Sequence, residues 1–305
     1  MSKVSNIFLG NTSINFGSAS KRLLRLYILE AIIFTIIILL TVSNIISLNL
    51  SIDFTGGTLY EVQNNLNRSD KEVQEFSSEI ILPVTRYESI DGGDYYRFRT
   101  VEGSIEEENF VLNQISNYFL TPTEGIDFQR VGPTFGDEIS NQGVRALIIF
   151  LLFITTLISL RYQFKFAIIA ILALLHDLLM CICIYILLGI EVTPATIIAI
   201  LTVLGYSLYD TVVIFDKLKD NSTKLKESRI SVNVMNTTFN EVIMRSINTS
   251  ITSIIPVTSL LIVGHYLGLQ GALTDFAIPL LIGMVSGTYS SIFVTSPFIT
   301  RLLTK

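Results

Sequence analysis

Six long apolar stretches run along the chain, and polar segments separate them. They cover residues 27–48, 144–160, 166–188, 194–215, 247–267 and 276–299. A helix that crosses a bilayer needs about 20 mainly apolar residues. A buried core helix of a soluble protein is the alternative for any one stretch, but six of them favour a membrane. The sequence therefore predicts an α-helical membrane protein with six transmembrane helices.

The longest polar segment, residues 49–143, is long enough for one small domain. Strand-like and helix-like runs alternate within it, at residues 58–62, 69–80, 81–89, 95–101, 104–119 and 126–131. Ser104 and Glu107 have the spacing of a capping box, which marks the start of the second helix. The order β-α-β-β-α-β is the ferredoxin-like pattern. We therefore expect one α+β domain in addition to the six-helix bundle.

Lysine and arginine residues indicate the side of the membrane on which each polar segment lies. Fourteen of the 21 fall in four segments, at residues 1–26, 161–165, 216–246 and 300–305. The short segments 189–193 and 264–275 have none. Because basic residues gather on the cytoplasmic side, we expect a cytoplasmic N-terminal segment, loop 216–246 and tail. Residues 49–143 then form an external domain; its 17 acidic and 6 basic residues do not oppose this, since long domains cross regardless of charge.

Composition narrows the class of protein further. Half of the residues are hydrophobic and 15% are charged, whereas a soluble domain has about 25% charged residues. Two cysteines and two histidines exclude a disulfide framework and a cysteine-rich zinc site. The net charge of −5 argues against nucleic acid as a partner. With no nucleotide-binding or metal-binding motif, we expect no enzyme, no cofactor and no metal, and any work must draw on an ion gradient, a partner or binding.

Asp210 is the clearest candidate for a functional residue, because an ionisable group at membrane depth is costly. Tyr206 and Ser207 precede it by four and three residues, so both can face its carboxyl group. Thr202 lies one turn further along this polar stripe, and Thr211 follows Asp210 directly. The stripe favours a proton relay at Asp210. The alternative is an acid near a helix end that points to the lipid headgroups.

His176 and Asp177 are a second candidate, near the middle of the third apolar stretch. Adjacent helical residues point about 100° apart, so both cannot face one partner. We expect one to face the fourth helix and the other to meet a neighbouring chain. A structural hydrogen bond between helices is the alternative. Glu30, in the first stretch, is expected to reach the interface and is assigned no role.

Small and hydroxyl-bearing residues mark faces for helix packing. Gly283, Gly287 and Ser291 follow at spacing four, a pattern that lets helices approach closely. Gly205 is expected to serve as a packing position or as a hinge. Hydroxyl groups lie along one face of the fifth helix, at Ser246, Thr249, Ser250 and Ser253. We interpret that face as one that forms hydrogen bonds between helices.

Five short motifs follow one another along nearly the whole chain. They are Asp53-Phe54-Thr55-Gly56-Gly57, Val131-Gly132-Pro133, Ala173-Leu174-Leu175-His176-Asp177, a run from Gly205 to Asp216 that reads GYSLYDTVVIFD, and Gly287-Thr288-Tyr289-Ser290-Ser291-Ile292-Phe293. In this order, and with one external domain after the first helix, they resemble the SecF branch of the SecD/SecF family. That family belongs to the resistance-nodulation-division superfamily.

The resemblance implies a function and a set of partners. It implies a subunit of the Sec protein-export machinery in the bacterial plasma membrane, which acts with a SecD-like subunit and the Sec channel. It also implies that the proton gradient drives a late step in the export of polypeptides, and that Asp210, Asp177 and His176 act as a proton relay. The motif residues Asp53, Gly56, Gly57, Gly132, Pro133, Gly205 and Gly287 are then structural.

Two departures from the family pattern leave alternatives open. Lys217 stands where the family has arginine after Phe215-Asp216, and the resemblance puts Ser253 at the position of the arginine of the fifth helix. If that arginine assists proton transfer, this chain must manage without it or its partner supplies the charge. One alternative function is therefore a structural subunit that is not coupled to protons. The other is an exporter of small molecules or lipids from the same superfamily.

Overall fold

The computed structural model describes residues 14–90, 93–225, 230–266 and 272–304. It divides the chain into two compact units. One unit comprises Met1–Asn49 and Ala146–Lys305, and the other comprises Leu50–Arg145. The ends of the predicted cytoplasmic segments, residues 1–13 and 305, lie outside the described residues.

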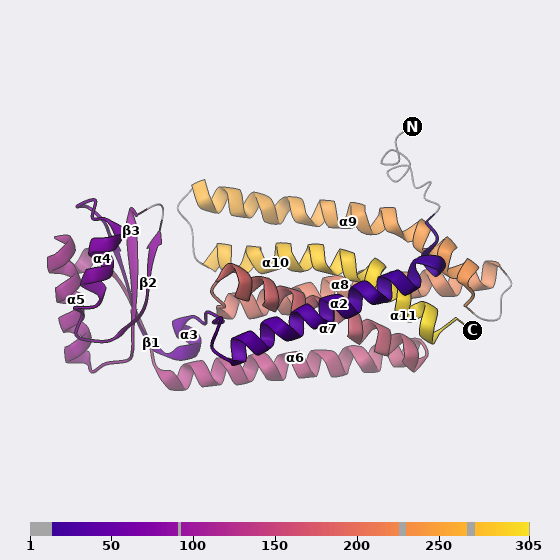
Figure 1. The fold of residues 1–305 in the computed structure, drawn as a ribbon, viewed down its shortest axis with the longest axis horizontal. Helices are drawn as coiled ribbons and strands as arrows, with labels where there is room; N and C mark the ends of the chain where they lie inside the picture. The colour runs from indigo at the N-terminus through magenta and orange to yellow at the C-terminus, as the bar shows by residue number, and fades with distance from the viewer. Residues whose placement is uncertain (1–13, 91–92, 226–229, 267–271, 305) are drawn as a thin grey trace. The chain divides into compact units, whose positions relative to one another are not determined.

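The helical unit contains the long helices of the chain (Figure 1). They are α2 (Phe16–Val42), the part of α6 (Pro133–Arg161) from Ala146 onward, α7 (Phe164–Leu188), α8 (Pro194–Lys224), α9 (Val232–Tyr266), α10 (Ala272–Tyr289) and α11 (Thr295–Leu302). A π-helical turn, Ser290–Val294, joins α10 to α11. Within the described residues six runs are long and apolar enough to cross a membrane, and the sixth joins α10, the turn and α11. The predicted six-helix membrane architecture is confirmed.

The helices do not end where the apolar stretches end. Helix α2 begins at Phe16, where the side chain of Asn15 caps it, and stops at Val42 rather than at residue 48. Asn44, two residues later, has a positive φ of 56°, which a helix does not contain. The expected loop at 216–246 is mostly helical, since α8 continues to Lys224 and α9 begins at Val232. Charged residues such as Lys and Glu have good helix propensity, so helices extend past their apolar cores.

The start of α2 is fixed to the first turns of α9. The ring of Phe16 is fully buried and stacks on Phe239 with 4.9 Å between ring centroids. The amide of Gly17 donates to Asn236 Oδ1 over 3.0 Å, and the amide of Ile14 donates to Asn240 Oδ1 over 2.9 Å. Residues of the N-terminal segment and of loop 216–246, both predicted to be cytoplasmic, therefore pack against each other, although more than 200 residues separate them.

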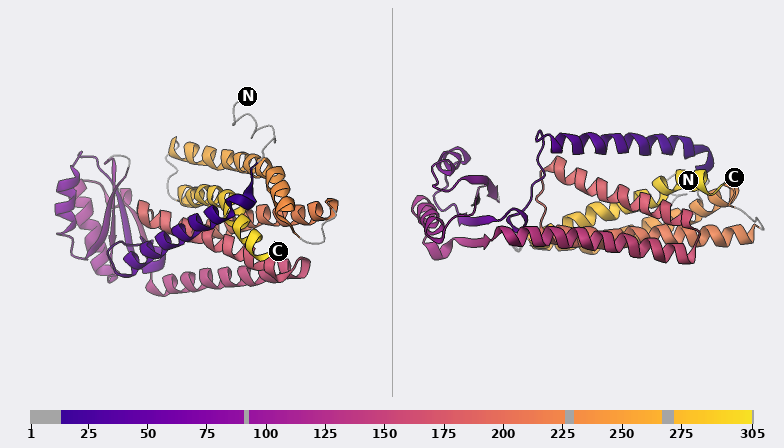
Figure 2. Two further views of the ribbon diagram at one scale, coloured as in Figure 1. Left: turned by 45° about the vertical axis from the view of Figure 1, so that its right-hand side comes forward. Right: turned by 90° about the horizontal axis from the view of Figure 1, so that it is seen from below.

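Helix α10 lies along α8, as the different views of Figures 1 and 2 show. A methyl group at Gly283 would lie 2.2 Å from Val203, and one at Gly287 would lie 2.8 Å from Cβ of Ser207. No real side chain tolerates such contacts, so the close packing predicted for these glycines is confirmed. Gly205 differs, because nothing lies within 4 Å of a methyl group placed there. Within the described residues Gly205 is not a packing position.

The smaller unit is a four-stranded antiparallel sheet with helices on one face (Figure 1). In chain order it contains α3 (Ile52–Thr55), β1 (Gly57–Gln63), α4 (Asp70–Ser77), β2 (Val84–Ile90), β3 (Tyr95–Thr100), α5 (Ile105–Phe119) and β4 (Asp127–Val131). The sheet order β2-β3-β1-β4 and the β-α-β-β-α-β sequence confirm the ferredoxin-like prediction. Every second side chain of β1 and β3 points under the helices, so Tyr60 and Phe98 are fully buried beside Phe119 of α5.

Local sequence explains the start of α5. The side chain of Ser104 accepts from the amide of Glu107, and the Glu107 carboxylate accepts from the amide of Ser104 over 2.8 Å, which is the predicted capping box. These hydrogen bonds lower the pKa of Glu107, because they favour its charged form. The neighbouring Glu108 is buried and was not singled out from the sequence. Its Oε1 accepts from Thr58 over 2.9 Å and lies 3.3 Å from Nε of Arg130.

Candidate functional site

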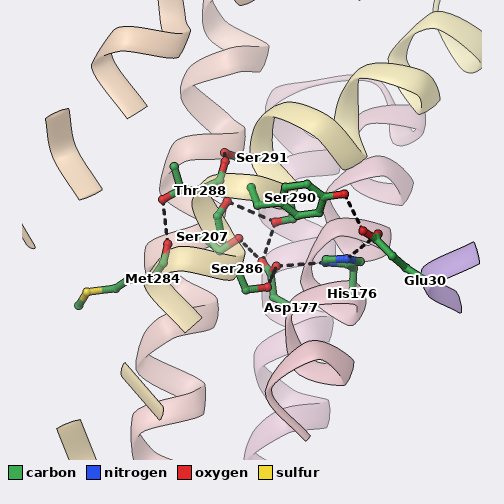
Figure 3. A network of polar contacts seen from close by, with 11 residues as sticks. Glu30, His176, Asp177, Ser207, Met284, Ser286, Thr288, Ser290 and Ser291 are labelled. Carbon is green, nitrogen blue, oxygen red and sulfur yellow. Dashed lines mark hydrogen bonds and ion pairs between the residues drawn. The ribbon is translucent and has the colours of Figure 1, made fainter. Parts of the chain in front are cut away.

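The carboxylate of Asp177 lies at the centre of a buried polar network in the helical unit (Figure 3). It accepts three hydroxyl hydrogen bonds from three neighbouring elements, namely α8, α10 and the π-helical turn. Ser207 of α8 donates to Oδ2 over 2.5 Å, Ser290 donates to Oδ2 over 2.9 Å, and Ser286 of α10 donates to Oδ1 over 2.7 Å. The side chain of Asp177 has no exposed surface. Three donors on two oxygens match the needs of a buried anion, which requires charge-assisted hydrogen bonds.

The packing of α8 and α10 brings these hydroxyl groups together. Gly287 lies against Ser207, and without a side chain it lets the two helices approach. Ser286 and Ser290 are four residues apart, so both lie on the face of their helix that meets α7. Ser290 is also the first residue of the π-helical turn. Such turns occur frequently at functional sites, because they change the direction of side chains within a helix.

His176 extends this network to α2. Its Nδ1 lies 3.4 Å from Oδ1 of Asp177, and its Nε2 lies 3.3 Å from Oε2 of Glu30. The other carboxyl oxygen of Glu30 accepts a 2.7 Å hydrogen bond from the hydroxyl of Tyr289. The prediction that one member of the His176–Asp177 pair meets a neighbouring chain is therefore wrong for the described contacts. Asp177 faces α8 and α10, and His176 faces α2 of the same chain.

Sequence reasoning gave Glu30 no role, although it belongs to this network. Its partners His176 and Tyr289 are 146 and 259 residues away along the chain. The available signal was a single carboxylate in an apolar helix, which is costly unless a partner compensates it. That signal identifies Glu30 as unusual, but only the packing of α2 against α7 identifies the partner.

Asp210 occupies a different environment on the same helix as Ser207. Its side chain is buried, and within the described residues its Oδ2 has no hydrogen-bond partner. The hydroxyl of Ser246 and the charge of Arg245, both on α9, act on the carboxyl group. The carboxyl group of Asp210 therefore interacts with α9 and keeps one acceptor atom without a hydrogen-bond partner among the described residues.

The residues of the polar stripe predicted around Asp210 form hydrogen bonds with other partners. Ser207 donates to Asp177, and Tyr206 donates to Ser250 of α9 over 3.3 Å. Thr202 is exposed and donates to the carbonyl of Ile198 in its own helix. Residues three and four positions before Asp210 flank its face of the helix, so nearby helices compete for their hydroxyl groups.

The remaining hydroxyl-bearing residues connect α8, α9 and α10. Ser250 contacts the hydroxyl of Thr288 in addition to accepting from Tyr206. This bears out hydrogen bonding between helices along the face of α9 that includes Ser250. Thr211 is buried on α8, next to Asp210 in sequence. Thr249 instead donates to the carbonyl of Arg245, one turn back in its own helix.

Arg245 is a basic residue of α9 whose charge acts on the carboxyl group of Asp210. It is exposed and lies eight residues before Ser253, the position to which the resemblance assigns the family's arginine. Its Nη2 donates to the hydroxyl of Tyr209 over 3.1 Å. Ser253 remains without a positive charge at the family's arginine position, so the alternatives that the chain manages without this arginine or that a partner supplies the charge stay open.

The end of the α8 motif forms a separate cluster with the end of α6. Nη2 of Arg161 lies 2.9 Å from each carboxyl oxygen of Asp216, and the hydroxyl of Tyr162 donates to the same carboxylate. Burial and this contact with Asp216 raise the pKa of Tyr162 to about 12. Phe215 is fully buried and packs edge-on against Phe166. This part of the motif joins helix ends, and Lys217 contributes a contact to Glu241 of α9.

The first motif has a structural explanation in the smaller unit. The hydroxyl of Ser51 donates to Asp53 over 3.1 Å at the start of α3. Gly56 ends α3 with a φ of 70°, and Gly57 begins β1 with a φ of 117°. A methyl group on Gly57 would lie 2.4 Å from the carbonyl oxygen of Thr100. Both backbone conformation and space therefore require glycine at position 57.

The second motif is less constrained. Pro133 is the first residue of α6, a position that suits proline because the amide there has no partner within the helix. Nothing lies within 4 Å of a methyl group placed on Gly132.

Among the described side chains, no group of three or more His, Cys, Asp or Glu residues is arranged to hold a metal ion. The carboxyl, imidazole and hydroxyl groups of the network around Asp177 can exchange and store protons.

Comparison with known proteins decides the family. Residues 112–305 match the family described as "Protein export membrane protein SecD/SecF, C-terminal". Residues 48–63 match the "SecD/SecF GG Motif". The chain belongs to the SecD/SecF family. The SecD/SecF GG match covers Asp53, Gly56 and Gly57, and the longer match includes Asp177 and Asp210.

Relatives within the SecD/SecF family cover most of the chain. It is 32% identical over 272 residues to protein translocase subunit SecF of Streptomyces coelicolor, which covers 87% of this chain and 73% of the relative. It is 30% identical over 309 residues to SecF of Petrotoga mobilis, which covers 95% of this chain and 97% of the relative. The predicted family is confirmed, and with it a SecF-like role in Sec protein export.

A solved structure shows the same fold. The crystal structure of SecDF from Thermus thermophilus, described as a translocon-associated membrane protein, superposes with a TM-score of 0.82 at 27% identity. The match covers 96% of this chain and 39% of that chain. This SecD/SecF family member therefore spans about two fifths of the longer SecDF chain. Its membrane fold of the resistance-nodulation-division type is confirmed.

Proposed function

We propose that this protein is a SecF-type subunit that couples the proton gradient to a late step of polypeptide export, with Asp210 as the proton carrier. The observation that carries the proposal is the state of the Asp210 carboxyl group. It is buried, and one of its oxygens has no hydrogen-bond partner among the described residues. Because a structural acid is normally saturated with donors, an unused acceptor in the membrane points to a group that exchanges protons.

The contrast between Asp210 and Asp177 supports separate roles. Asp177 accepts from three hydroxyl groups, which stabilise its charge in one arrangement. Asp210 has the charge of Arg245 nearby and an open oxygen. Ser207, which bonds to Asp177, lies one helical turn before Asp210, so a change at either acid is transmitted along α8. We assign Asp177 and His176 to the same relay as a second, more tightly held group.

The energy available to such a relay is modest but sufficient for a switch. A proton that crosses a membrane potential of 100 mV releases about 2.3 kcal/mol. Each 1.4 kcal/mol changes an equilibrium by about tenfold, so one proton shifts two conformations by roughly 50-fold. Protonation of Asp210 removes its attraction to Arg245, and these two residues belong to α8 and α9. We infer that this contact biases the relative position of the two helices.

A SecD-like subunit and the Sec channel are the proposed partners. The similar Thermus protein is named SecDF, and this chain matches 39% of it, which leaves room there for a second helical unit. The outer faces of α6 and α9 present exposed apolar side chains, such as Leu152, Phe153 and Ile255. We propose that these faces contact lipid and the SecD-like subunit. The ferredoxin-like domain is proposed to contact the exported polypeptide.

The orientation is also a proposal. The described positive side chains near the helix ends include Lys21, Arg25, Arg161, Lys224 and Arg301. Under the positive-inside rule these ends face the cytoplasm, so both termini are cytoplasmic and residues 49–143 are external. The compartment is the bacterial plasma membrane, in line with the family.

The deciding experiment measures preprotein export into inverted vesicles, with and without a proton gradient. Asp210→Asn keeps the shape and hydrogen-bonding capacity of the side chain but cannot release a proton. We expect it to insert and to bind its partner, and to lose stimulation by the gradient. Asp210→Glu should keep part of the stimulation. Asp216→Asn is the matched control, since that acid joins helix ends near the surface.

Wild-type export with unchanged gradient dependence in Asp210→Asn would exclude Asp210 as the carrier. The role of a structural subunit without proton coupling would then be favoured. An exporter of small molecules would instead show a substrate-dependent proton flux in vesicles that contain no preprotein.

A further inference from the structure

We propose that Glu30, His176 and Asp177 form a branch of the relay in which the imidazole passes one proton between two carboxyl groups. This inference rests on the proposed function, because it assigns a second route for protons to the same subunit. It is carried by one geometric fact. Each ring nitrogen of His176 faces a different carboxyl oxygen, at 3.3 Å for Glu30 and 3.4 Å for Asp177 (Figure 3).

The number of protons in this trio follows from the hydrogen bonds. A neutral imidazole carries one N–H and an imidazolium carries two. If Glu30 and Asp177 are both ionised, both contacts require the imidazolium. If the ring is neutral, one of the carboxyl groups must carry the second proton. Both contacts are therefore hydrogen bonds when the trio holds one proton more than two carboxylates and a neutral imidazole do. That additional proton can reside on Glu30, on His176 or on Asp177.

Transfer between the two ends is balanced without any further reactant. The proton on Oε2 of Glu30 moves to Nε2 of His176, while the hydrogen on Nδ1 moves to Oδ1 of Asp177. Glu30 becomes a carboxylate, Asp177 becomes a carboxylic acid, and the ring changes from one neutral tautomer to the other. The net charge of the trio stays the same, so no charge is created in the low-dielectric interior.

Burial gives this branch a direction from the surface of α2 to the interior. The exposed fraction of the side chain falls from 25% for Glu30 to 1% for His176 and 0% for Asp177. In a membrane helix a partly exposed acid is costly unless it exchanges protons or has a partner. Glu30 is therefore the outer member that takes up or releases the proton, and Asp177 is the inner member next to α8.

The hydroxyl groups around Glu30 and Asp177 can bond to each of these acids in its ionised and in its protonated form. The hydroxyl of Tyr289 donates to Glu30, and the serines on α8 and α10 donate to Asp177. Hydroxyl groups can rotate from donor to acceptor, so they also suit a protonated carboxyl group. The other titratable groups that face the trio are Tyr27 on α2 and Cys181 on α7. Within the described residues, His176 is the basic group that contacts both acids.

The sequence makes a direct test possible, because the chain has two histidines, His176 and His265. His265→Gln leaves His176 as the one imidazole, and ¹⁵N-histidine labelling then reports its two nitrogens in lipid nanodiscs. We expect both nitrogen signals to differ between samples at about pH 5 and about pH 9, because the trio then holds different numbers of protons. Glu30→Gln, in the same background, should change the Nε2 signal and the titration, and Asp177→Asn should change the Nδ1 signal.

The second readout is export. Positioned groups for proton transfer contribute about 10²-fold or more. Because Asp210 remains, we expect a smaller loss in Glu30→Gln, of about tenfold in the gradient-dependent part of export. Glu30→Asp should recover part of it, because the shorter acid still titrates, and His265→Gln should behave as wild type. A purely structural Glu30 predicts that Glu30→Gln, which keeps the length and hydrogen-bonding capacity of the side chain, is no more damaging than Glu30→Asp.

Two results overturn the branch. One is a His176 spectrum that stays in a single protonation state and a single tautomer over the whole pH range. The other is a titration that Glu30→Gln leaves unchanged. Both are independent of export, so they are distinguishable from failure of the proposed function, which would appear as unchanged gradient dependence in Asp210→Asn. If Glu30→Gln does not insert, the Glu30→Asp spectrum decides, because a shorter acid must alter the Nε2 signal.

Discussion

Ser207 donates a 2.5 Å hydrogen bond to Oδ2 of Asp177 and so joins α8 to α7 in the interior of the helical unit. The same serine lies against Gly287 of α10. One residue therefore takes part both in the polar network and in a close contact between α8 and α10. The position of Ser207 explains why a short hydroxyl side chain is required there: a longer one would separate α8 from α10.

Removal of this hydroxyl group should destabilise the protein. Ser207→Ala leaves Oδ2 of Asp177 with Ser290 as donor, and loss of one hydrogen bond to a charged group costs about 1.5–3 kcal/mol. We expect a lower temperature of thermal unfolding in detergent, measured by circular dichroism. Ser259→Ala is the control, since that exposed hydroxyl bonds to a carbonyl of its own helix. Equal unfolding temperatures for both variants would contradict the role of Ser207.

Gly287→Ala tests the packing of α10 on α8. Its methyl group would lie 2.8 Å from Cβ of Ser207, and such overpacking costs about 1–3 kcal/mol. Gly205→Ala is the matched control on α8, because a methyl group there meets no atom within 4 Å. It should be neutral, or stabilising by up to about 1 kcal/mol through helix propensity. The temperature of thermal unfolding of both variants, measured in the same detergent, tests this prediction. The prediction fails if Gly205→Ala lowers that temperature more than Gly287→Ala does.

Gly57→Ala tests the glycine pair of the first motif. It combines a φ of 117° with a contact of 2.4 Å to the carbonyl oxygen of Thr100. A side chain in such a conformation costs about 1–3 kcal/mol before the clash is counted. We expect faster proteolysis of the ferredoxin-like domain in the intact protein. Gly132→Ala should resist the protease like the wild type, since its surroundings are open. Similar cleavage rates for the two variants would disprove the requirement.

Arg130→Met tests the buried acid of the ferredoxin-like domain. Nε of Arg130 lies 3.3 Å from Oε1 of Glu108, whose side chain is 3% exposed. Because Arg130 itself is 36% exposed, solvent screens the pair, and we expect a cost of about 1–2 kcal/mol rather than the 3–5 of a fully buried pair. The double variant with Glu108→Gln should recover part of this loss. A double-mutant cycle of unfolding free energies measures the coupling, and strict additivity would show that none exists.

The sequence alone was enough for the features that depend on local pattern. Apolar runs of about 20 residues specify membrane helices whatever they pack against, and the described part of the chain contains six such helices. Alternating residues and the Ser104 capping box specify the strands and helices of the ferredoxin-like domain, because these signals act within a few residues. The spacing of Gly283 and Gly287 likewise predicted a close helix contact.

Only the tertiary structure decided which polar groups meet. From the sequence, Ser207 and Tyr206 were expected to serve Asp210, but they bond to Asp177 and Ser250. Glu30 finds its partners 146 and 259 residues away, in His176 and Tyr289. A helical pattern fixes the angle of a side chain about its own axis, whereas the rotation and depth of one helix against another are set by packing over its whole length. The hydroxyl and carboxyl groups of this network have several possible partners of similar chemistry, so their pairing follows from that packing and not from their spacing in the chain.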